Sequence, residues 1–240
     1  MFTRYRTQGF ILEKTDAGEA DRLFTVYTKD FGRLELIARS VRKIQSKLRA
    51  GLEIFYLSEI EFIQGKIQKT LTDAVLIDGF KNLRKDLVRL FIARRISEVF
   101  NGLIKGQEPD EKLWHLLSEV FKALDDKNLK TEACNLLYHY FVWNFLSLLG
   151  YRPDLYHCSL CRERLMPDGI YLSLKEKSLI CGRCQKKTGQ EKLLVFPADT
   201  VKIIRVLLKK DWALAKRLKI KDKDFASLKI ISDHYLRQIE

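Results

Sequence analysis

Short runs of β-branched and aromatic residues, separated by polar turns, occupy the first eighty residues of the chain. Runs of this composition predict β-strands. Five can be bounded, at residues 7–14, 21–28, 33–38, 52–62 and 70–77. In the fourth run, apolar residues at even positions, such as Ile60 and Phe62, alternate with odd positions that are mostly glutamate. We therefore expect one face of that strand to be buried.

Five short strands in a segment of this length predict a small closed barrel. One such design is the OB-fold, a five-stranded barrel that commonly binds oligonucleotides. The first part of the chain is therefore expected to be an OB-fold barrel.

Apolar residues recur at helical spacing between residues 81 and 150, which predicts three helices. The second is expected to begin after Pro109, with Asp110 as its N-cap. The third is expected to run from about residue 132 to 149 and to end at Gly150, a natural residue after a helix end. Its aromatic residues are expected to be core, although any excess apolar groove could receive a partner peptide. They are Tyr138, Tyr140, Phe141, Trp143 and Phe145.

Two Cys-x-x-Cys pairs, separated by 19 residues, are the most specific chemical pattern in the chain. They consist of Cys158, Cys161, Cys181 and Cys184. Each pair can place two thiolates on one side of a tight turn, and four sulfurs in a closed tetrahedron suit a structural Zn²⁺. The alternatives are two disulfides, which need an oxidising compartment, or four unrelated thiols. Gly182 is expected to ease the backbone path of the second turn.

His157 and the fifth cysteine, Cys134, are not expected to bind the metal. His157 adjoins a ligand and is expected to be an ordinary exposed histidine, while Cys134 lies in a helical pattern and is expected to be a buried thiol. A closed four-sulfur site is structural, because a catalytic zinc keeps one position open for water. The function must therefore lie elsewhere in the chain.

The helical pattern returns after Pro197, and its apolar stripes are expected to pack back on the central bundle. The predicted fold class is a multi-domain α+β protein: an N-terminal OB-fold β-barrel, followed by an α-helical bundle with an inserted four-cysteine zinc module. The predicted domains are the barrel at 1–80, the α-helical domain at 81–153 and 195–240, and the zinc module at 154–194.

The charge balance adds a polyanionic partner to this picture. Lys and Arg number 44 against 31 Asp and Glu, a net charge of +13, and the sequence pI is about 9.5. A chain of this kind attracts nucleic acid; the alternative is a protein that is merely basic. No apolar run is long enough for a membrane span, and the first ten residues show no signal peptide. Five cysteines without a secretion signal indicate a reducing cytosol.

A stretch without acidic residues connects two predicted barrel strands, between Leu36 and Leu52. A flexible basic loop beside a barrel can follow a phosphate backbone, and barrel aromatics can stack on bases; the alternative is a solvated loop with no partner. The candidate nucleic-acid-binding residues are Arg33, Arg39, Arg42, Lys43, Lys47 and Arg49. The candidate stacking residues, each of which can equally be barrel core, are Phe10, Tyr27, Phe31 and Tyr56.

Motifs of the common enzymes are absent from the sequence. There is no glycine-rich phosphate loop, no G-x-G-x-x-G fingerprint, no His-Glu-x-x-His helix and no nucleophile elbow. The expectation is a protein that is not an enzyme.

Three local patterns give the chain a resemblance to the RecO family of bacterial recombination mediators. They are residues 13–25, followed by Phe31-Gly32 and the basic 38–43; residues 145–155, a helix end that leads directly to Cys158; and residues 179–184 around the second cysteine pair. The order of barrel, helical bundle and four-cysteine module agrees as well. In the family the stretch after the third strand resembles Gly-Ala-Arg-Arg, whereas here Ser40-Val41 interrupts it.

The resemblance implies a non-enzymatic role in DNA repair and recombination. RecO-like proteins bind single- and double-stranded DNA and anneal complementary strands. They engage the C-terminal tail of the single-stranded DNA-binding protein, and act with RecR to load RecA. It also implies a cytoplasmic, nucleoid-associated bacterial protein. Two readings from other classes remain: a zinc-ribbon nucleic-acid-binding module of transcription or translation, and an enzyme with a structural zinc.

Overall fold

The computed structural model describes residues 3–65, 67–173, 178–187, 193–237 and 239. The chain forms two compact units, residues 1–134 and 135–240. The division falls within one helix, and each unit is described separately below. The three-part division at 1–80, 81–153 with 195–240, and 154–194 remains a prediction about domains; part of its third segment lies outside the described residues.

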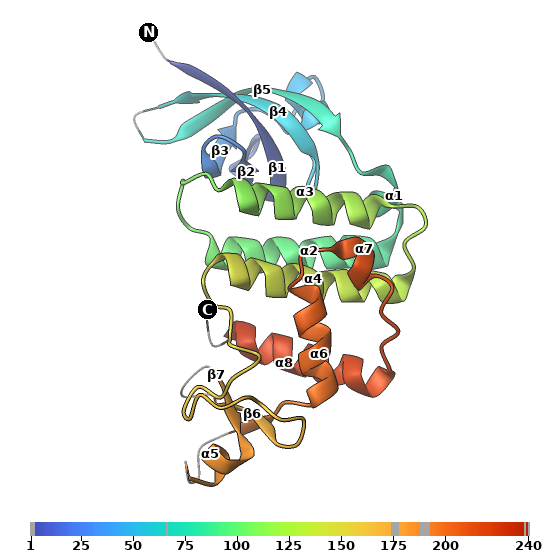
Figure 1. Ribbon diagram of the computed structural model, residues 1–240. Coiled ribbons are helices and arrows are strands. Elements are labelled where there is room, and N and C mark those ends of the chain that lie inside the picture. Colours follow the sequence, from blue (N-terminus) through green and yellow to red (C-terminus); the bar gives the residue numbers. More distant parts are fainter. Residues whose placement is uncertain (1–2, 66, 174–177, 188–192, 238, 240) are drawn as a thin grey trace. The chain divides into compact units, whose positions relative to one another are not determined.

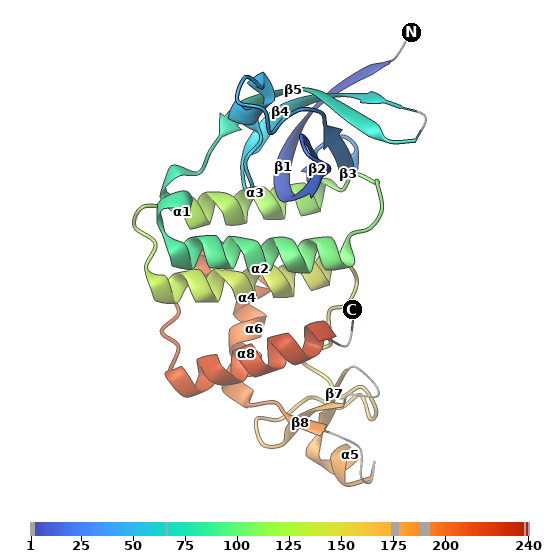
Figure 2. The same cartoon turned by 180° about the vertical axis from the view of Figure 1, so that it is seen from behind.

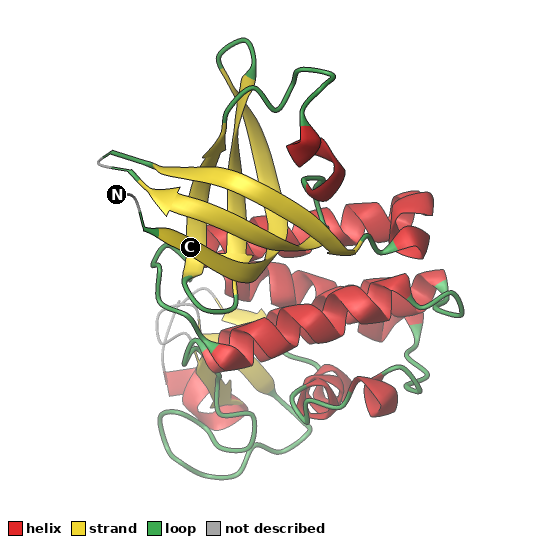
Figure 3. Ribbon diagram, turned by 90° about the horizontal axis from the view of Figure 1, so that it is seen from above, coloured by secondary structure: helices red, strands yellow, loops and turns green. Residues whose placement is uncertain are grey.

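A closed five-stranded barrel begins the first unit (Figure 3). Its strands are β1 (Arg4–Ala17), β2 (Asp21–Thr28), β3 (Gly32–Ala38), β4 (Leu57–Gln64) and β5 (Lys69–Asp78). The order around the barrel is β1-β2-β3-β5-β4, and β1 pairs with β4 to close it. Only the β3–β5 pair is parallel, and it covers two residue pairs. This topology confirms the predicted OB-fold barrel.

The fourth strand starts later than the sequence pattern predicts. Residues 52–56 are not strand, and β4 begins at Leu57. The reason is a sharp turn at Phe55, which has a positive φ of 67° and donates its N–H to the Ile11 carbonyl at 2.7 Å. Phe55 is buried, so the strict alternation of buried and exposed positions expected from residue 54 onward is wrong until β4 begins.

Three helices follow the barrel in the same unit: α1 (Lys81–Lys85), α2 (Leu87–Leu103) and α3 (Glu111–Asp125). Asp110 caps α3 as predicted, because its carboxylate accepts the N–H groups of Lys112 and Leu113. Asp86 caps α2 in the same way. Helices α2 and α3 lie side by side (Figures 1 and 2), and α3 packs on β1 through Phe10, whose ring centroid is 5.0 Å from that of Trp114.

The second unit is built around α4 (Thr131–Leu148), whose last residues belong to it. The later helices are α5 (Gly182–Lys187), α6 (Ala198–Leu207), α7 (Trp212–Ala215) and α8 (Asp222–Arg237). Two α4 side chains, His139 and Trp143, hydrogen-bond the buried Ser232 hydroxyl of α8 at 3.0 Å each. The five aromatic residues expected to be core are all buried. The C-terminal helices therefore pack on α4, as the apolar stripes predict.

Helix α4 ends as the sequence predicts. Gly150 has a positive φ of 86°, and the N–H of Tyr151 reaches back to the Leu146 carbonyl at 2.9 Å. A glycine in this conformation ends a helix without the steric cost that a Cβ would impose. The chain then turns at Pro153 toward the first cysteine pair.

A small three-stranded sheet of the second unit, ordered β7-β6-β8, carries Cys181 at the end of β7. Its strands are β6 (Ile170–Ser173), β7 (Ser178–Cys181) and β8 (Leu193–Val195). The antiparallel β6–β7 pair confirms the hairpin arm predicted for residues 169–173, whereas Leu174 of that prediction lies outside the described residues. Among the helices of the described residues, none is both long and apolar enough to cross a membrane.

Candidate metal centre and nucleic-acid interface

The four cysteine sulfurs predicted to bind metal lie together. The Sγ atoms of Cys158, Cys161, Cys181 and Cys184 are all within 4.8 Å of one another. The Sγ atoms of Cys161 and Cys181 are 3.8 Å apart, too far for a disulfide, and all four thiols are free. A tetrahedron with metal–sulfur distances of about 2.3 Å has edges of about 3.8 Å. The sulfurs are thus arranged as ligands of one ion.

Local hydrogen bonds shape the first cysteine turn. The N–H of Arg162 donates to the Cys158 carbonyl at 2.9 Å, and the N–H of Cys158 donates to the Glu163 carbonyl at 2.8 Å. Arg162 has a positive φ of 62°, which lets the chain turn back within four residues. As predicted, His157 is exposed; its Nδ1 lies 3.1 Å from the Asp154 carboxylate rather than among the sulfurs.

The second turn is made differently from the sequence expectation. Cys181 ends β7 and Gly182 begins α5, so a strand-to-helix junction presents the second pair. Gly182 has an ordinary φ, and a Cβ added there meets nothing closer than 3.6 Å. The expected conformational role of Gly182 is therefore wrong. The glycine that adopts a positive φ, 83°, is Gly169, which immediately precedes β6.

The sulfurs have unequal proton affinities. Burial raises the pKa of Cys158, but N–H groups of Cys161, Cys181 and Leu160 donate to its sulfur and bring the pKa down to about 6. Burial and the three neighbouring sulfurs raise the pKa of Cys184 to about 12. Four thiolates at this spacing repel one another, so full deprotonation requires a cation at their centre. The donor set, four cysteine sulfurs within 4.8 Å of one another, fits a structural Zn²⁺.

The second candidate site is the basic loop between β3 and β4. The loop was expected to be flexible, but it includes a short 3-10 helix, η1 (Lys47–Gly51). Val41 and Leu52 are buried in the barrel core and Leu48 packs against it. The Ser58 hydroxyl donates to the Gly51 carbonyl at 2.7 Å, and a Cβ on Gly51 would meet the Ala74 carbonyl oxygen at 2.4 Å. The loop is thus held against the barrel at several points.

The six basic residues predicted to bind nucleic acid do not share one environment. Arg39, Lys43, Lys47 and Arg49 are exposed, and within the described part of the chain they form no ion pair. Arg42 pairs with Asp16 at 3.4 Å and donates to the Gly18 carbonyl at 3.3 Å. Arg33 lies on β3, its side chain is 16% exposed, and it pairs with Glu35 at 3.0 Å. Four of the six therefore present an uncompensated charge.

Two of the four candidate stacking residues are core rather than surface. Phe10 and Tyr27 are fully buried, and Tyr27 packs on Phe100 of α2 with ring centroids 4.7 Å apart. They are buried because α2 and α3 cover this part of the barrel, which the strand pattern does not reveal. Phe31 packs against the barrel core next to Phe62, and the ring of Tyr56 is covered by the Arg84 guanidinium at 4.8 Å.

A groove in the first unit was not singled out from the sequence. Its volume is about 670 Å³, and its lining includes Leu90 and Phe91 of α2, with Lys14, Arg84 and Arg94 among its charged groups. The Phe91 side chain is 59% exposed, and Leu87 on the same helix is more exposed still. Glu53 pairs with Lys14 at 2.8 Å, and Glu98 pairs with Arg94 at 2.8 Å. The sequence signal that could have indicated this groove is Phe91, an apolar residue of α2 whose side chain is not packed into the core.

Comparison with known proteins covers nearly the whole chain. The family model "Recombination protein O N terminal" matches residues 1–80, and "Recombination protein O C terminal" matches residues 84–238. A protein named DNA repair protein RecO from Dehalococcoides mccartyi strain 195 is 30% identical over 227 residues, which is 94% of this chain and 87% of that protein. The protein of the same name from Roseiflexus sp. strain RS-1 is 29% identical over 236 residues, 98% of this chain and 81% of that protein. One from Halalkalibacterium halodurans is 25% identical over 231 residues, covering 96% and 88%.

Proposed function

The chain belongs to the RecO family of DNA repair proteins, and from this premise we propose that it is a recombination mediator without catalytic activity. It binds single- and double-stranded DNA and anneals complementary strands. The observation that carries the proposal is the anchored basic loop on the OB-fold barrel, with four exposed and unpaired cations. OB-fold barrels with such loops follow phosphate backbones.

Annealing by this protein requires no covalent chemistry. Two complementary strands repel each other through their phosphates, and cations held beside them displace counterions and lower that repulsion. Because the loop is fixed by Val41, Leu48 and Leu52, its cations lose little conformational freedom when they meet phosphates. Phe10 and Tyr27 are buried and do not stack on the bases.

We assign a structural Zn²⁺ to the four cysteines. Cys158, Cys161, Cys181 and Cys184 would hold it, and the metal supplies only the positive charge that lets four sulfurs stand together. Its role is to fold the segment around β6 and β7. The spacing of the sulfurs, all within 4.8 Å of one another, supports this assignment.

The partners we propose follow from the family: RecR, the C-terminal tail of the single-stranded DNA-binding protein, and RecA as the protein loaded afterward, in the cytoplasm at the nucleoid. The groove beside α2 supports the tail in particular. Exposed Phe91 offers an apolar surface, and an acidic peptide would replace Glu53 and Glu98, the carboxylates that pair with Arg84 at 3.8 Å and with Arg94 at 2.8 Å. A short acidic and apolar tail needs this combination.

Strand annealing tests the proposal directly. Complementary oligonucleotides, each coated with single-stranded DNA-binding protein, are mixed with and without the chain in the absence of nucleotide, and duplex formation is followed by fluorescence. We expect the chain to accelerate annealing. Retained DNA binding without annealing would instead favour a zinc-ribbon binding module of transcription or translation, and the absence of both would refute the assignment of DNA as ligand.

Removal of the four unpaired loop cations is expected to weaken DNA binding. In the variant Arg39→Gln, Lys43→Gln, Lys47→Gln and Arg49→Gln, each lost phosphate contact lowers the salt slope by about 0.7 on single strands, so the slope falls by up to about 3 units. Fluorescence anisotropy at several salt concentrations measures it.

A matched variant controls for net charge. Lys112→Gln, Lys122→Gln, Lys127→Gln and Lys130→Gln remove the same charge from exposed positions away from the loop. We expect that control to keep a slope within about 1 unit of the unaltered chain. Equal slopes for the two variants would show that only net charge matters and that the loop is not the site.

A further inference from the structure

A second basic surface lies in the other unit, in residues 209–223, here called the C-terminal basic segment. It contains seven basic residues against two acidic ones, Asp211 and Asp222. The basic residues are Lys209, Lys210, Lys216, Arg217, Lys219, Lys221 and Lys223, and all seven are exposed. The segment connects α6 to α8 and includes α7 (Figures 1 and 2).

This segment is attached to its unit by apolar side chains placed between the charges. Trp212 is buried and its ring centroid lies 5.5 Å from that of Tyr140 on α4. Ala215 is fully buried. Beyond it, Leu218 and Ile220 are half-buried while Arg217, Lys219 and Lys221 are exposed. The alternation turns the charged side chains to one side, away from the core of the unit.

The basic side chains of the segment form no close ion pair. Across residues 209–223, all of which the structure describes, no basic side chain forms an ion pair. The Asp211 carboxylate is used to cap α7, where it accepts the N–H of Leu214 at 2.9 Å. Nearby Asp199 has a lowered pKa, first because Lys202 donates a hydrogen bond to it and further because Lys223 and Lys221 lie close. Asp199 therefore offsets part of the charge of Lys221 and Lys223, and the segment keeps a large excess of positive charge.

We propose that the C-terminal basic segment is a second, independent DNA-binding surface, so that one chain holds two nucleic-acid segments at once. The inference rests on the proposed function, because it takes DNA as the ligand of this chain. Annealing requires two strands on one protein, and a single loop with four free cations accounts for only one of them. A phosphate backbone is the ligand that a row of cations without acidic partners recognises.

The chemistry of the segment favours nucleic acid over an acidic protein. Protein interfaces bury an apolar core surrounded by a polar rim. Of the exposed large apolar side chains in the described residues, only Leu214 belongs to residues 209–223. Phosphate contacts need no such core, since cations at the surface are sufficient.

Bridging of two strands tests the inference. Two non-complementary oligothymidylates, one carrying a donor and the other an acceptor dye, are mixed with the full chain, and energy transfer reports both strands on one particle. The variant Lys216→Gln, Arg217→Gln, Lys219→Gln and Lys221→Gln is expected to lose about tenfold or more of this transfer, because these residues carry the second set of phosphate contacts. Its affinity for one labelled strand should stay within about threefold, since the barrel loop remains.

The charge-matched variant at Lys112, Lys122, Lys127 and Lys130 should bridge like the unaltered chain. If the C-terminal variant bridges two strands as well as the unaltered chain does, the inference is overturned. It is also overturned if the variant loses single-strand binding together with bridging, because the C-terminal basic segment would then be the main DNA-binding surface rather than a second one. If the unaltered chain binds one strand but does not bridge two, the inference is overturned while the proposed function stands. If that chain binds no DNA, the proposed function fails with it.

Discussion

Cys158→Ser and Cys181→Ser are each expected to release the bound metal and unfold the segment around β6 and β7. Each change removes one of four sulfurs that lie within 4.8 Å of one another. Structural Zn²⁺ contributes on the order of 10 kcal/mol to the folding of small zinc modules, and that module has little else to stabilise it, since its strands are three and four residues long. Metal analysis should fall from one zinc per chain to about none.

Cys134→Ser is the matched control for the cysteine variants. Cys134 is a buried thiol outside the cluster, and burial raises its pKa, so it is not a ready metal ligand. We expect this variant to keep its metal. The same metal content and the same melting temperature in all three variants would refute the zinc assignment. Iron in place of zinc would be seen in the same elemental analysis, and hydrogen exchange of the chelated chain would show whether residues 157–187 lose protection.

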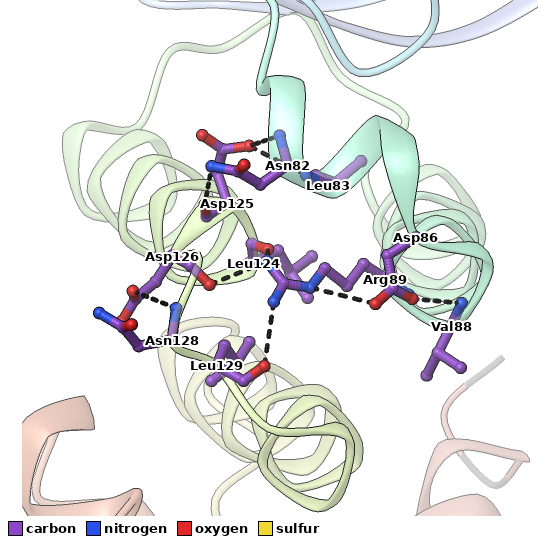
Figure 4. Close-up of polar contacts among 10 residues, drawn as sticks. All are labelled: Asn82, Leu83, Asp86, Val88, Arg89, Leu124, Asp125, Asp126, Asn128 and Leu129. Atoms are coloured by element: carbon purple, nitrogen blue, oxygen red, sulfur yellow. Dashed lines mark hydrogen bonds and ion pairs between the residues drawn. The ribbon is translucent and has the colours of Figure 1, made fainter.

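Arg89→Met is expected to destabilise the first unit by about 3–5 kcal/mol, the cost of breaking a buried charged network. Arg89 is 6% exposed. Its guanidinium donates to the carbonyls of Leu124 at 2.9 Å, Asp126 at 2.8 Å and Leu129 at 3.0 Å. Figure 4 shows these carbonyls converging on one side chain from the end of α3 and the connection after it. Methionine fills the space but removes the guanidinium donor from three carbonyls, of which that of Asp126 still accepts the Leu129 N–H at 3.0 Å.

The network also includes the starts of two helices. Asp86, the cap of α2, lies 3.5 Å from the Arg89 Nε, and Asp125 accepts the N–H groups of Asn82 and Leu83 at the start of α1 (Figure 4). Arg89 therefore ties α2 to the end of α3, whose other face carries the barrel through Trp114 and Phe121. We expect its loss to raise hydrogen exchange in residues 124–130.

Arg94→Met on the same helix is the control for Arg89. The Arg94 side chain is 75% exposed and pairs with Glu98 one turn away at 2.8 Å. Exposed pairs of this kind contribute about 0.3–0.5 kcal/mol. Urea unfolding followed by circular dichroism compares the two variants. Equal urea midpoints for the two variants would mean that buried Arg89 contributes no more to the free energy of unfolding than exposed Arg94.

Features determined by neighbours along the chain were predictable. Asp110 caps α3 because a carboxylate two or three residues before free N–H groups reaches them in any fold. Gly150 ends α4 for a similarly local reason. The two thiols of each pair lie close together because a two-residue spacing places both on one turn, and the strand runs predicted the number of barrel strands. The two pairs meet because Ser159 donates its N–H to the Leu179 carbonyl of β7 at 2.9 Å.

Features determined by distant elements were not predictable. Phe10 and Phe31 look alike in sequence, but α3 covers the first and not the second. Arg42 and Lys43 are neighbours in the basic loop, yet only Arg42 meets an acidic partner, Asp16 of the opposite hairpin. The prediction of strand for residues 52–56 was wrong because the chain turns at Phe55, whose N–H donates to the Ile11 carbonyl of β1.

The amino-acid sequence alone was sufficient to identify the family, the two cysteine pairs, the five barrel strands and the long helices, because each leaves a local pattern in the chain. It did not indicate the short elements α1, α5, α7 and β8. Which loop cations lack an acidic partner, which aromatic rings are core and why Arg89 is buried became apparent from the packing of the folded chain alone. The physical reason is that burial and charge compensation are properties of a side chain's surroundings. Those surroundings are assembled from segments up to 93 residues apart, as between His139 and Ser232.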